Sequence, residues 1–453
     1  MTTKELAKFT SNLTYEKLSN HSIDMAKKCI LDHLGVAIRG SQEKPAKLIR
    51  NVVLKSNSEE ATVFDKNTKK ATALEAAFCN GAASHTLDFD DLHNPSIIHL
   101  ACVVVPPALA LAEANHKTGK ELITAVCSGY EAGGRTGESV VPESYFFWHT
   151  TGTAGTIGAA AAAANILGLD EHQTLMCYGS AGTQTAGLWE FLKEGAMSKA
   201  LHAGKGAFAG VLSAQLAQAG FTGASKILEG EKGFCHAMVR EPHLEKLTEG
   251  LGEELKIDKN SFKPYACCKH SHAAIYAIQV LRKEYNLQPE DIAGIKIYVN
   301  DITNYLINNP NPQNPYGCKF SIQYCTSAML KYGVVGVEQF NADVINDGIV
   351  HQLMARTEVI LDDEIEKIHQ DNSAKLASKV ELVCKDGRCL SMQVDFPKGD
   401  PDNPFTWEEA KEKFMNLVIP VYGVGKAEKI YTFVRTLEVC EDVAEGIKNC
   451  LEE

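Results

Sequence analysis

The chain has 453 residues, of which 45% are hydrophobic and 23% are charged, so it can bury the cores of two or three globular domains. Its net charge of −12 argues against general affinity for nucleic acid or anionic membranes. The longest apolar run is too short to span a bilayer. Without an apolar leader at the start, and without disulfide-like spacing of the 14 cysteines, we expect a cytoplasmic protein with reduced thiols.

Helical periodicity dominates the sequence from the N-terminus to about residue 250. Apolar residues recur at spacings of three and four, as in helices that face a core, in residues 22–38, 71–79, 107–117, 121–140, 154–167, 171–186 and 205–219. Few segments in this part alternate with a period of two. The first half is therefore predicted to be all-helical.

The pattern changes near residue 256. Residues 292–300 are rich in β-branched side chains, and residues 379–396 form two alternating runs joined at Asp386-Gly387, which predicts a hairpin. The proline-rich segment 397–404 ends this part, and Thr406 is expected to cap a further helix. We therefore predict a mainly α protein, with an all-helical domain from residues 1–257 and 402–453 and a smaller α+β domain from residues 258–401.

The segment from residue 80 to 99 is the most informative part of the chain. Within otherwise apolar sequence it holds three carboxylates and three imidazoles, namely His85, Asp88, Asp90, Asp91, His93 and His99. Carboxylates beside imidazoles suit proton transfer, because environment can separate the pKa of an acid from that of a base. For each residue alone, an alternative carries at least equal weight: Asp90, Asp91 and His93 can simply cap and solvate a loop. The cluster as a whole favours a functional site.

His149 precedes a turn rich in threonine and glycine, Thr150 to Thr153, which opens a helix of small residues. Free backbone N–H groups at a helix start bind carboxylates or phosphates, so Thr151, Gly152 and Thr153 are candidate substrate-binding residues. Close helix packing explains the glycines equally well, and it is the preferred interpretation of the alanine run 159–164. The spacing fits neither a dinucleotide fingerprint nor a Walker loop.

Lys199, His202 and Lys205 are spaced three apart, which places them on one helical face. Such cations can neutralise an anionic substrate, although a solvated basic stripe is a common alternative.

The segment from residue 262 to 272 contains two cysteines and two histidines, Cys267, Cys268, His270 and His272. A zinc site is a weak interpretation, because adjacent cysteines lack the spacing of structural zinc ligands. Lys263, His270 and His272 fit better as groups that line an anionic pocket at a domain junction.

Taken together, these motifs resemble the MmgE/PrpD family, which includes 2-methylcitrate dehydratase, cis-aconitate decarboxylase and iminodisuccinate epimerase. The resemblance rests on motifs in the same order along nearly the whole chain: residues 80–91, 149–164, 199–206, 263–268, 319–324 and 397–404. It implies a helical domain, a smaller α+β lid, a homodimer and an active site between the domains. It also implies small di- or tricarboxylate substrates and no metal or organic cofactor.

Carried over by position, the catalytic residues implied by the resemblance are Asp88, His99, His149, Lys199 and Lys263. His202, His270 and His272 join the turn residues as candidates for substrate binding.

The chain departs from the family pattern at three points. His99-Leu-Ala stands where His-Pro-Gly is usual, and Leu92 stands where many members have threonine. A further histidine of the decarboxylases has no clean equivalent, and Cys268 stands near its place.

The resemblance implies a lyase that removes a proton next to a carboxylate. His149 would act as general acid or base, Asp88 would orient or charge a histidine, and Lys199 and Lys263 would clamp substrate carboxylates. A hydro-lyase like 2-methylcitrate dehydratase comes first, an epimerase second and a decarboxylase third. The alternative of another class is a non-catalytic carboxylate- or zinc-binding protein.

Overall fold

The computed structural model describes residues 2–372 and 375–452, which form two compact units. The first unit combines Met1–Phe262 with Thr406–Glu453, and the second is Lys263–Phe405. The predicted boundaries fall a few residues earlier in the chain at both junctions. The predicted fold class, mainly α with a smaller α+β part, is confirmed.

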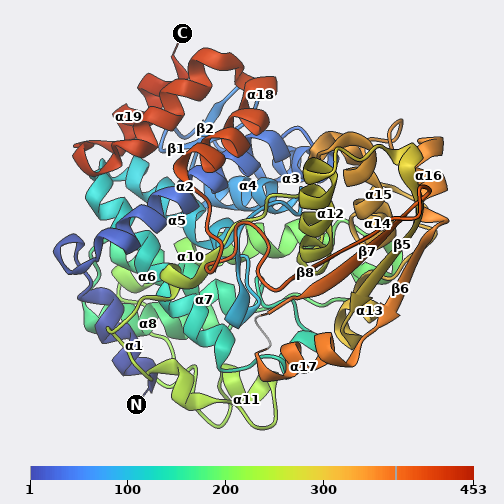
Figure 1. Ribbon diagram of the computed structural model, residues 1–453. Coiled ribbons are helices and arrows are strands. Elements are labelled where there is room, and N and C mark those ends of the chain that lie inside the picture. The colour runs from blue at the N-terminus through green and yellow to red at the C-terminus, as the bar shows by residue number, and fades with distance from the viewer. Residues whose placement is uncertain (1, 373–374, 453) are drawn as a thin grey trace. The chain divides into compact units, whose positions relative to one another are not determined.

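The first unit is built of helices (Figure 1). They pack around a core of small and aliphatic side chains. They are α1 (Thr2–Ser11), α2 (Asn20–Gly40), α3 (Lys44–Val53), α4 (Ala73–His85), α5 (Ala101–Ala114), α6 (Gly119–Glu138), α7 (Ala154–Ile166), α8 (Glu171–Gly182), α9 (Phe191–Glu194), α10 (Ser198–Gln218), α11 (Phe234–Met238), α18 (Trp407–Arg435) and α19 (Val443–Leu451).

Close packing explains the small residues of α7. A Cβ added to Gly158 would lie 2.8 Å from the carbonyl oxygen of Gly129 on α6, closer than real Cβ atoms approach. The alanines of α7 are buried. The alanine run is therefore a surface on which neighbouring helices approach closely.

The C-terminal helices belong to the first unit. Thr406 caps α18 in a capping box with Glu409, as expected from the sequence. Phe414 of α18 packs against Gly35 of α2, where an added Cβ would lie 3.2 Å from the phenyl ring. The second unit is thus inserted between two parts of one helical unit.

The first unit also contains short strands, which the sequence analysis did not predict. β1 (Ala61–Val63) pairs with β2 (Lys69–Ala71), and β3 (Leu92–His93) pairs with β4 (Asn260–Ser261), both antiparallel. Strands of two or three residues are too short for an alternating pattern to emerge.

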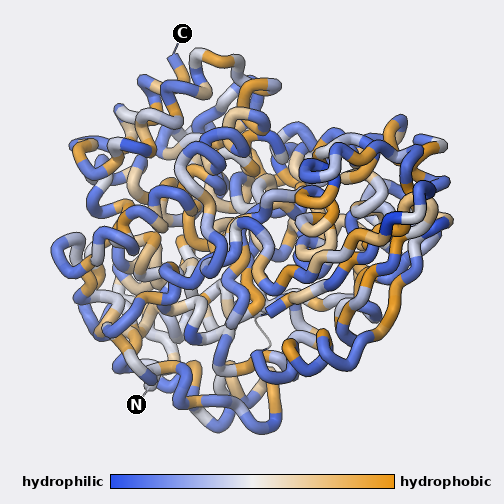
Figure 2. The backbone as a smooth tube through the Cα atoms, viewed as in Figure 1, coloured by the Kyte–Doolittle hydropathy of each residue, from blue (hydrophilic) through white to orange (hydrophobic). Residues whose placement is uncertain are grey.

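The second unit is a four-stranded sheet with helices. The strand order is β6-β5-β7-β8, with β5 parallel to β6 and the other pairs antiparallel. Hydrophilic and hydrophobic residues are interspersed along this unit (Figure 2), and every second residue of β7 is buried. The elements are α12 (His272–Glu284), β5 (Ile292–Val299), α13 (Asp301–Ile307), α14 (Pro315–Lys319), α15 (Ile322–Tyr332), α16 (Gly348–Met354), β6 (Thr357–Leu361), α17 (Asp363–Asp371), β7 (Ser378–Cys384) and β8 (Cys389–Val394).

Within the described residues, no helix combines the length and apolar character needed to cross a membrane.

His33 on α2 gives a prediction about stability. It is fully buried, neither ring nitrogen has a hydrogen-bond partner among the described residues, and burial lowers its pKa to about 3. In the unfolded chain His33 has its ordinary pKa of about 6.5 and binds a proton below that pH. The free energy of unfolding therefore falls as the pH drops from 6.5 toward 3. Replacing His33 with leucine should shrink the loss of unfolding free energy between pH 7 and pH 5 by about 2 kcal/mol. Urea unfolding at both pH values measures this, and an unchanged pH dependence would contradict it.

Candidate active site

The acidic segment after α4 turns sharply because Asp88 adopts a left-handed backbone conformation. Helix α4 ends at His85, and Asp88 has φ 55°, which is uncommon for a residue other than glycine. Ile97, two residues before His99, has φ 53°, a rarer state for a β-branched side chain. Strained backbone of this kind concentrates at functional sites.

Asp88 forms a buried ion pair with Lys199. Lys199 Nζ lies 2.5 Å from Asp88 Oδ1, and the two side chains are only 9% and 4% exposed. Lys199 lies at the start of α10, which packs against both α4 and α7. The structure therefore brings two of the predicted catalytic residues into direct contact.

Asp90 lies between two histidines. Its Oδ2 is 2.7 Å from Nδ1 of His85 and 3.4 Å from Nδ1 of His99. The rings of His85 and His99 meet edge to face, with centroids 4.8 Å apart. Asp90 is fully buried, so the expectation that it solvates a loop is wrong.

His149 stacks on the same group. Its ring lies nearly parallel to that of His85, with centroids 5.2 Å apart. Its Nδ1 is 3.2 Å from Nδ1 of His202, and Trp189 covers it at a centroid distance of 4.6 Å. Burial first, and then repulsion from the neighbouring histidines and Lys199, holds the pKa of His149 well below its usual value. His149 is therefore neutral at pH 7.

The basic stripe of α10 faces inward. Burial and nearby positive groups lower the pKa of His202 to about 4, and burial lowers the pKa of Lys205 to about 8. Lys205 donates a hydrogen bond to the carbonyl of Gln184. With Lys199 buried against Asp88, the alternative of a solvated stripe does not describe this face.

The turn at the start of α7 holds the loop that carries His99. The backbone N–H of His99 donates to Thr151 Oγ1 at 3.2 Å, and Thr150 donates to the carbonyl of Ile97. The N–H groups of Gly152 and Thr153 donate to the carbonyl of His149 at 2.9 and 3.2 Å. These donors are engaged within the turn, so a role in binding substrate stays a prediction for Thr151, Gly152 and Thr153.

Asp91 is buried and serves the architecture of the site. It accepts hydrogen bonds from Tyr130 (2.5 Å), Asn260 (2.8 Å) and the N–H of Ala101 (3.0 Å), at the start of α5. Burial raises its pKa to about 7. The predicted capping role fits Asp91.

His93 is buried rather than solvated. Its Nδ1 lies 2.8 Å from Ser96 Oγ, and burial lowers its pKa to about 3.

Sequence reasoning missed a cation from the C-terminal helix. Lys413 of α18 pairs with buried Asp32 at 2.5 Å, donates to the carbonyl of Phe89 at 2.7 Å and lies over its ring. Lysine in an amphipathic helix is usually solvated, so no local signal identified it. Trp189, whose ring lies beside that of His149, was also missed, because no local sequence signal identified it.

The remaining predicted residues belong to the second unit. Lys263 is buried. His270 is half-buried, and its Nδ1 lies 2.8 Å from Thr303 Oγ1. Burial first, and then repulsion from His369 and Lys263, lowers its pKa to about 4.

His272 is a core residue. It is fully buried, its Nε2 donates to the carbonyl of Cys267 at 3.3 Å, and its ring packs against Tyr265. Its binding role stays a prediction.

Metal ligation has one geometric candidate among the described residues. Ligand atoms of His85, Asp90 and His99 lie within 4.8 Å of one another. The cysteine and histidine run at residues 267–272 is not part of that group, which weighs against the zinc interpretation.

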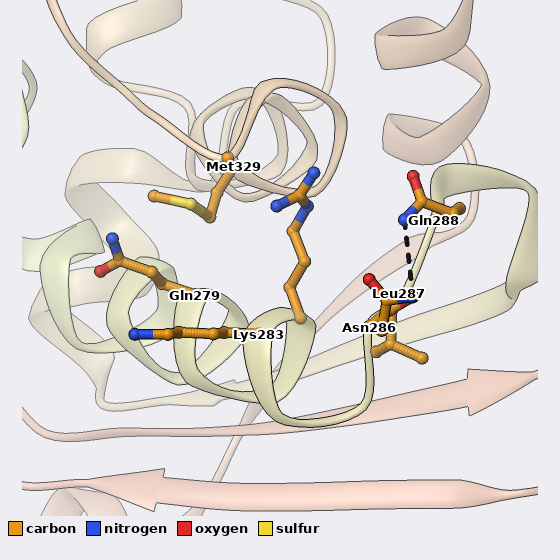
Figure 3. Close-up of a pocket in the computed structure, with 8 residues that line it drawn as sticks. Gln279, Lys283, Asn286, Leu287, Gln288 and Met329 are labelled. Atoms are coloured by element: carbon orange, nitrogen blue, oxygen red, sulfur yellow. Dashed lines mark hydrogen bonds between the residues drawn. The ribbon is translucent and has the colours of Figure 1, made fainter.

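The second unit also has a surface cavity of about 300 Å³ at the ends of α12 and α15 (Figure 3). Arg282 in this cavity donates to the carbonyl of Leu330, in the last turn of α15, at 3.0 Å. None of the predicted site residues lines it; the lining residues are Gln279, Arg282, Lys283, Asn286, Leu287, Gln288, Met329 and Gly333.

The buried Asp88–Lys199 pair gives a second prediction. Lys199→Met should lower the unfolding free energy by about 3 kcal/mol or more, because it leaves a buried carboxylate without its cation. The double variant Asp88→Asn/Lys199→Met should recover most of that loss. Urea unfolding measures both.

The exposed pair Lys246–Glu249 provides the control, and Lys246→Met should change stability little. Equal losses in Lys199→Met and in the double variant would contradict the pairing.

Comparison with known proteins identifies the family. The MmgE/PrpD N-terminal domain matches residues 4–247, and the MmgE/PrpD C-terminal domain matches residues 265–439. The chain is 26% identical over 474 residues to the cis-aconitate decarboxylase-like protein oryM of Aspergillus oryzae, covering 98% of this chain and 96% of that protein. It is 27% identical over 456 residues to the cis-aconitate decarboxylase of Homo sapiens, covering 97% and 92%. The protein is thus a member of the MmgE/PrpD family.

Proposed function

We propose that this protein is a lyase that acts on a small di- or tricarboxylate by moving a proton at a carbon next to a carboxylate. Membership of the MmgE/PrpD family already implies an enzyme that acts on carboxylic acids. The proposed proton transfer next to a carboxylate rests on the histidines, carboxylates and lysine of the first unit.

The observation that carries the proposal is the state of His149. Its Nε2 is buried and has no hydrogen-bond partner among the described residues, and its ring is neutral at pH 7. A neutral imidazole with an unpaired nitrogen can accept or deliver a proton. Nδ1 faces His202, so the tautomer of one ring depends on the other.

Removing a proton next to a carboxylate requires stabilisation of the negative charge that develops. Lys199 provides a buried cation, fixed by Asp88, in surroundings that screen charge poorly. We propose that Lys199 and Lys263 bind carboxylates of the substrate, Lys263 being the buried lysine of the second unit. His202 and His270 are proposed as further binding groups.

Elimination of water is the first proposed outcome, as in 2-methylcitrate dehydratase. The base removes the proton, the electron pair forms the double bond, and the β-hydroxyl leaves as water after protonation. This outcome needs nothing beyond a base, an acid and carboxylate clamps.

Decarboxylation is the second candidate, because the relatives named above are cis-aconitate decarboxylases or a protein named as similar to them. There the electron pair left by carbon dioxide is protonated at carbon. We rank this outcome second because a further histidine of the decarboxylases has no clean equivalent here, and Cys268 stands near its place. Epimerisation, in which the proton returns on the opposite face, is third. A homodimer and a cytoplasmic location remain predictions.

A substrate panel tests the proposal. Citrate, 2-methylcitrate, cis-aconitate and iminodisuccinate are each incubated with the protein in D₂O and followed by NMR. We expect turnover of at least one, with deuterium incorporated at a carbon next to a carboxylate. The product distinguishes an alkene, a decarboxylated acid and an epimer. Binding without turnover or exchange would contradict the proposal and support a non-catalytic carboxylate-binding protein.

A substitution tests the role of His149. His149→Asn keeps a nitrogen near the Nδ1 position and removes Nε2, so it should lower kcat at least 100-fold, within the usual contribution of general acid–base catalysis (about 10²–10⁴). His172 is exposed on α8, and His172→Asn should leave kcat unchanged. Near-wild-type turnover by the folded His149→Asn variant would show that His149 is not the proton carrier.

A further inference from the structure

His85 was not among the predicted catalytic or binding residues, although it contacts His99, His149 and Asp90 in the folded chain. It is the last residue of α4, and its side chain is 0% exposed. The ring touches His149 on one face, His99 at an edge and Asp90 through Nδ1. A side chain sealed from solvent in this way can act on the reaction only through its neighbours.

The two contacts of Asp90 differ in length. The contact to His85, at 2.7 Å, has the length of a charge-assisted hydrogen bond. The contact to His99, at 3.4 Å, is longer than a good hydrogen bond, as is common for catalytic contacts before a substrate binds. His85 therefore holds the carboxylate, and the carboxylate in turn faces His99.

This arrangement selects tautomers. An ionised carboxylate only accepts hydrogen bonds, so Nδ1 of His85 carries a proton when it bonds to Asp90, and Nδ1 of His99 must do so whenever that longer contact closes. In the neutral form of either ring, Nε2 is then the basic nitrogen. For His85, that nitrogen has no hydrogen-bond partner among the described residues. For His99, Nδ1 is buried while the side chain as a whole is 11% exposed, and we infer that a substrate reaches Nε2.

We propose that His85 and Asp90 are positioning residues that fix the tautomer of His99: His85 anchors Asp90, and Asp90 holds the proton of His99 on Nδ1. The effect on turnover rests on the proposed proton-transfer function. The effect on the tautomer does not, because it is a property of the protein without substrate.

Two substitutions of His85 separate its donor from its ring. His85→Asn places an amide N–H near the position of Nδ1 but has no ring. His85→Phe keeps a ring that stacks on His149 but cannot donate to Asp90. Asp90→Leu removes the acceptor with a side chain of similar shape, and His172→Asn on the exposed face of α8 is the control.

The first readout is the tautomer of His99, measured by ¹⁵N NMR of histidine-labelled protein and assigned with a His99→Asn variant. Wild type and His85→Asn should show His99 protonated at Nδ1. His85→Phe and Asp90→Leu should show a mixture of tautomers. An unchanged His99 signal in folded Asp90→Leu would overturn the inference.

The second readout is steady-state kinetics on whichever substrate the panel identifies. His85→Phe and Asp90→Leu should lower kcat on the order of 100-fold, with KM within about threefold of wild type, because a proton carrier is mispositioned while binding is kept. His85→Asn should restore most of the kcat that His85→Phe loses. The reverse order, with Phe active and Asn inactive, would show that His85 acts through its ring on His149 and would overturn the proposal. Absence of turnover in wild type would contradict the proposed function, while the NMR readout would still decide the positioning role.

Discussion

Three buried carboxylates lie within four consecutive residues, and each requires a compensating partner. A charge removed from water without a partner costs several kcal/mol. Asp88 is paired with Lys199 from α10, Asp90 faces two imidazoles, and Asp91 takes hydrogen bonds from α6, β4 and the start of α5. The helices of the first unit are thereby fixed around one short segment. A displaced helix would leave an uncompensated charge in the core.

The same requirement prepares the site for chemistry. Burial keeps His149 neutral, and Asp88 forms a buried ion pair with Lys199. In the proposed mechanism, His149 and Lys199 would therefore need little reorganisation during the reaction, and such preorganisation is a main source of electrostatic catalysis. The strained conformations at Asp88 and Ile97 are maintained by contacts on both sides of the segment.

Much of this could be predicted from the sequence, because helical periodicity, the hairpin at Asp386 and the cap at Thr406 are local signals. The clustering of acids and histidines could also be predicted, because these residues are close together in the sequence. Four of the five predicted catalytic residues belong to the first unit. Partners supplied by distant elements could not be predicted. Lys413 resembles any surface lysine in the sequence, and only the folded chain shows it at Phe89. His272 shows another limit, since a core histidine and a ligand-binding one share the same sequence pattern, and its binding role stays a prediction.

The contact between Lys413 and the carbonyl of Phe89 joins residues 324 positions apart, and the whole second unit is translated between them. During synthesis, the segment from His85 to Asp91 therefore emerges long before the cation that neutralises Asp32 beneath it. Domains usually fold in the order in which they leave the ribosome. Here the contacts of Lys413 with Asp32 and Phe89 can form only after the inserted unit has been made, so the segment from His85 to Asp91 lacks this packing partner until α18 has been synthesised.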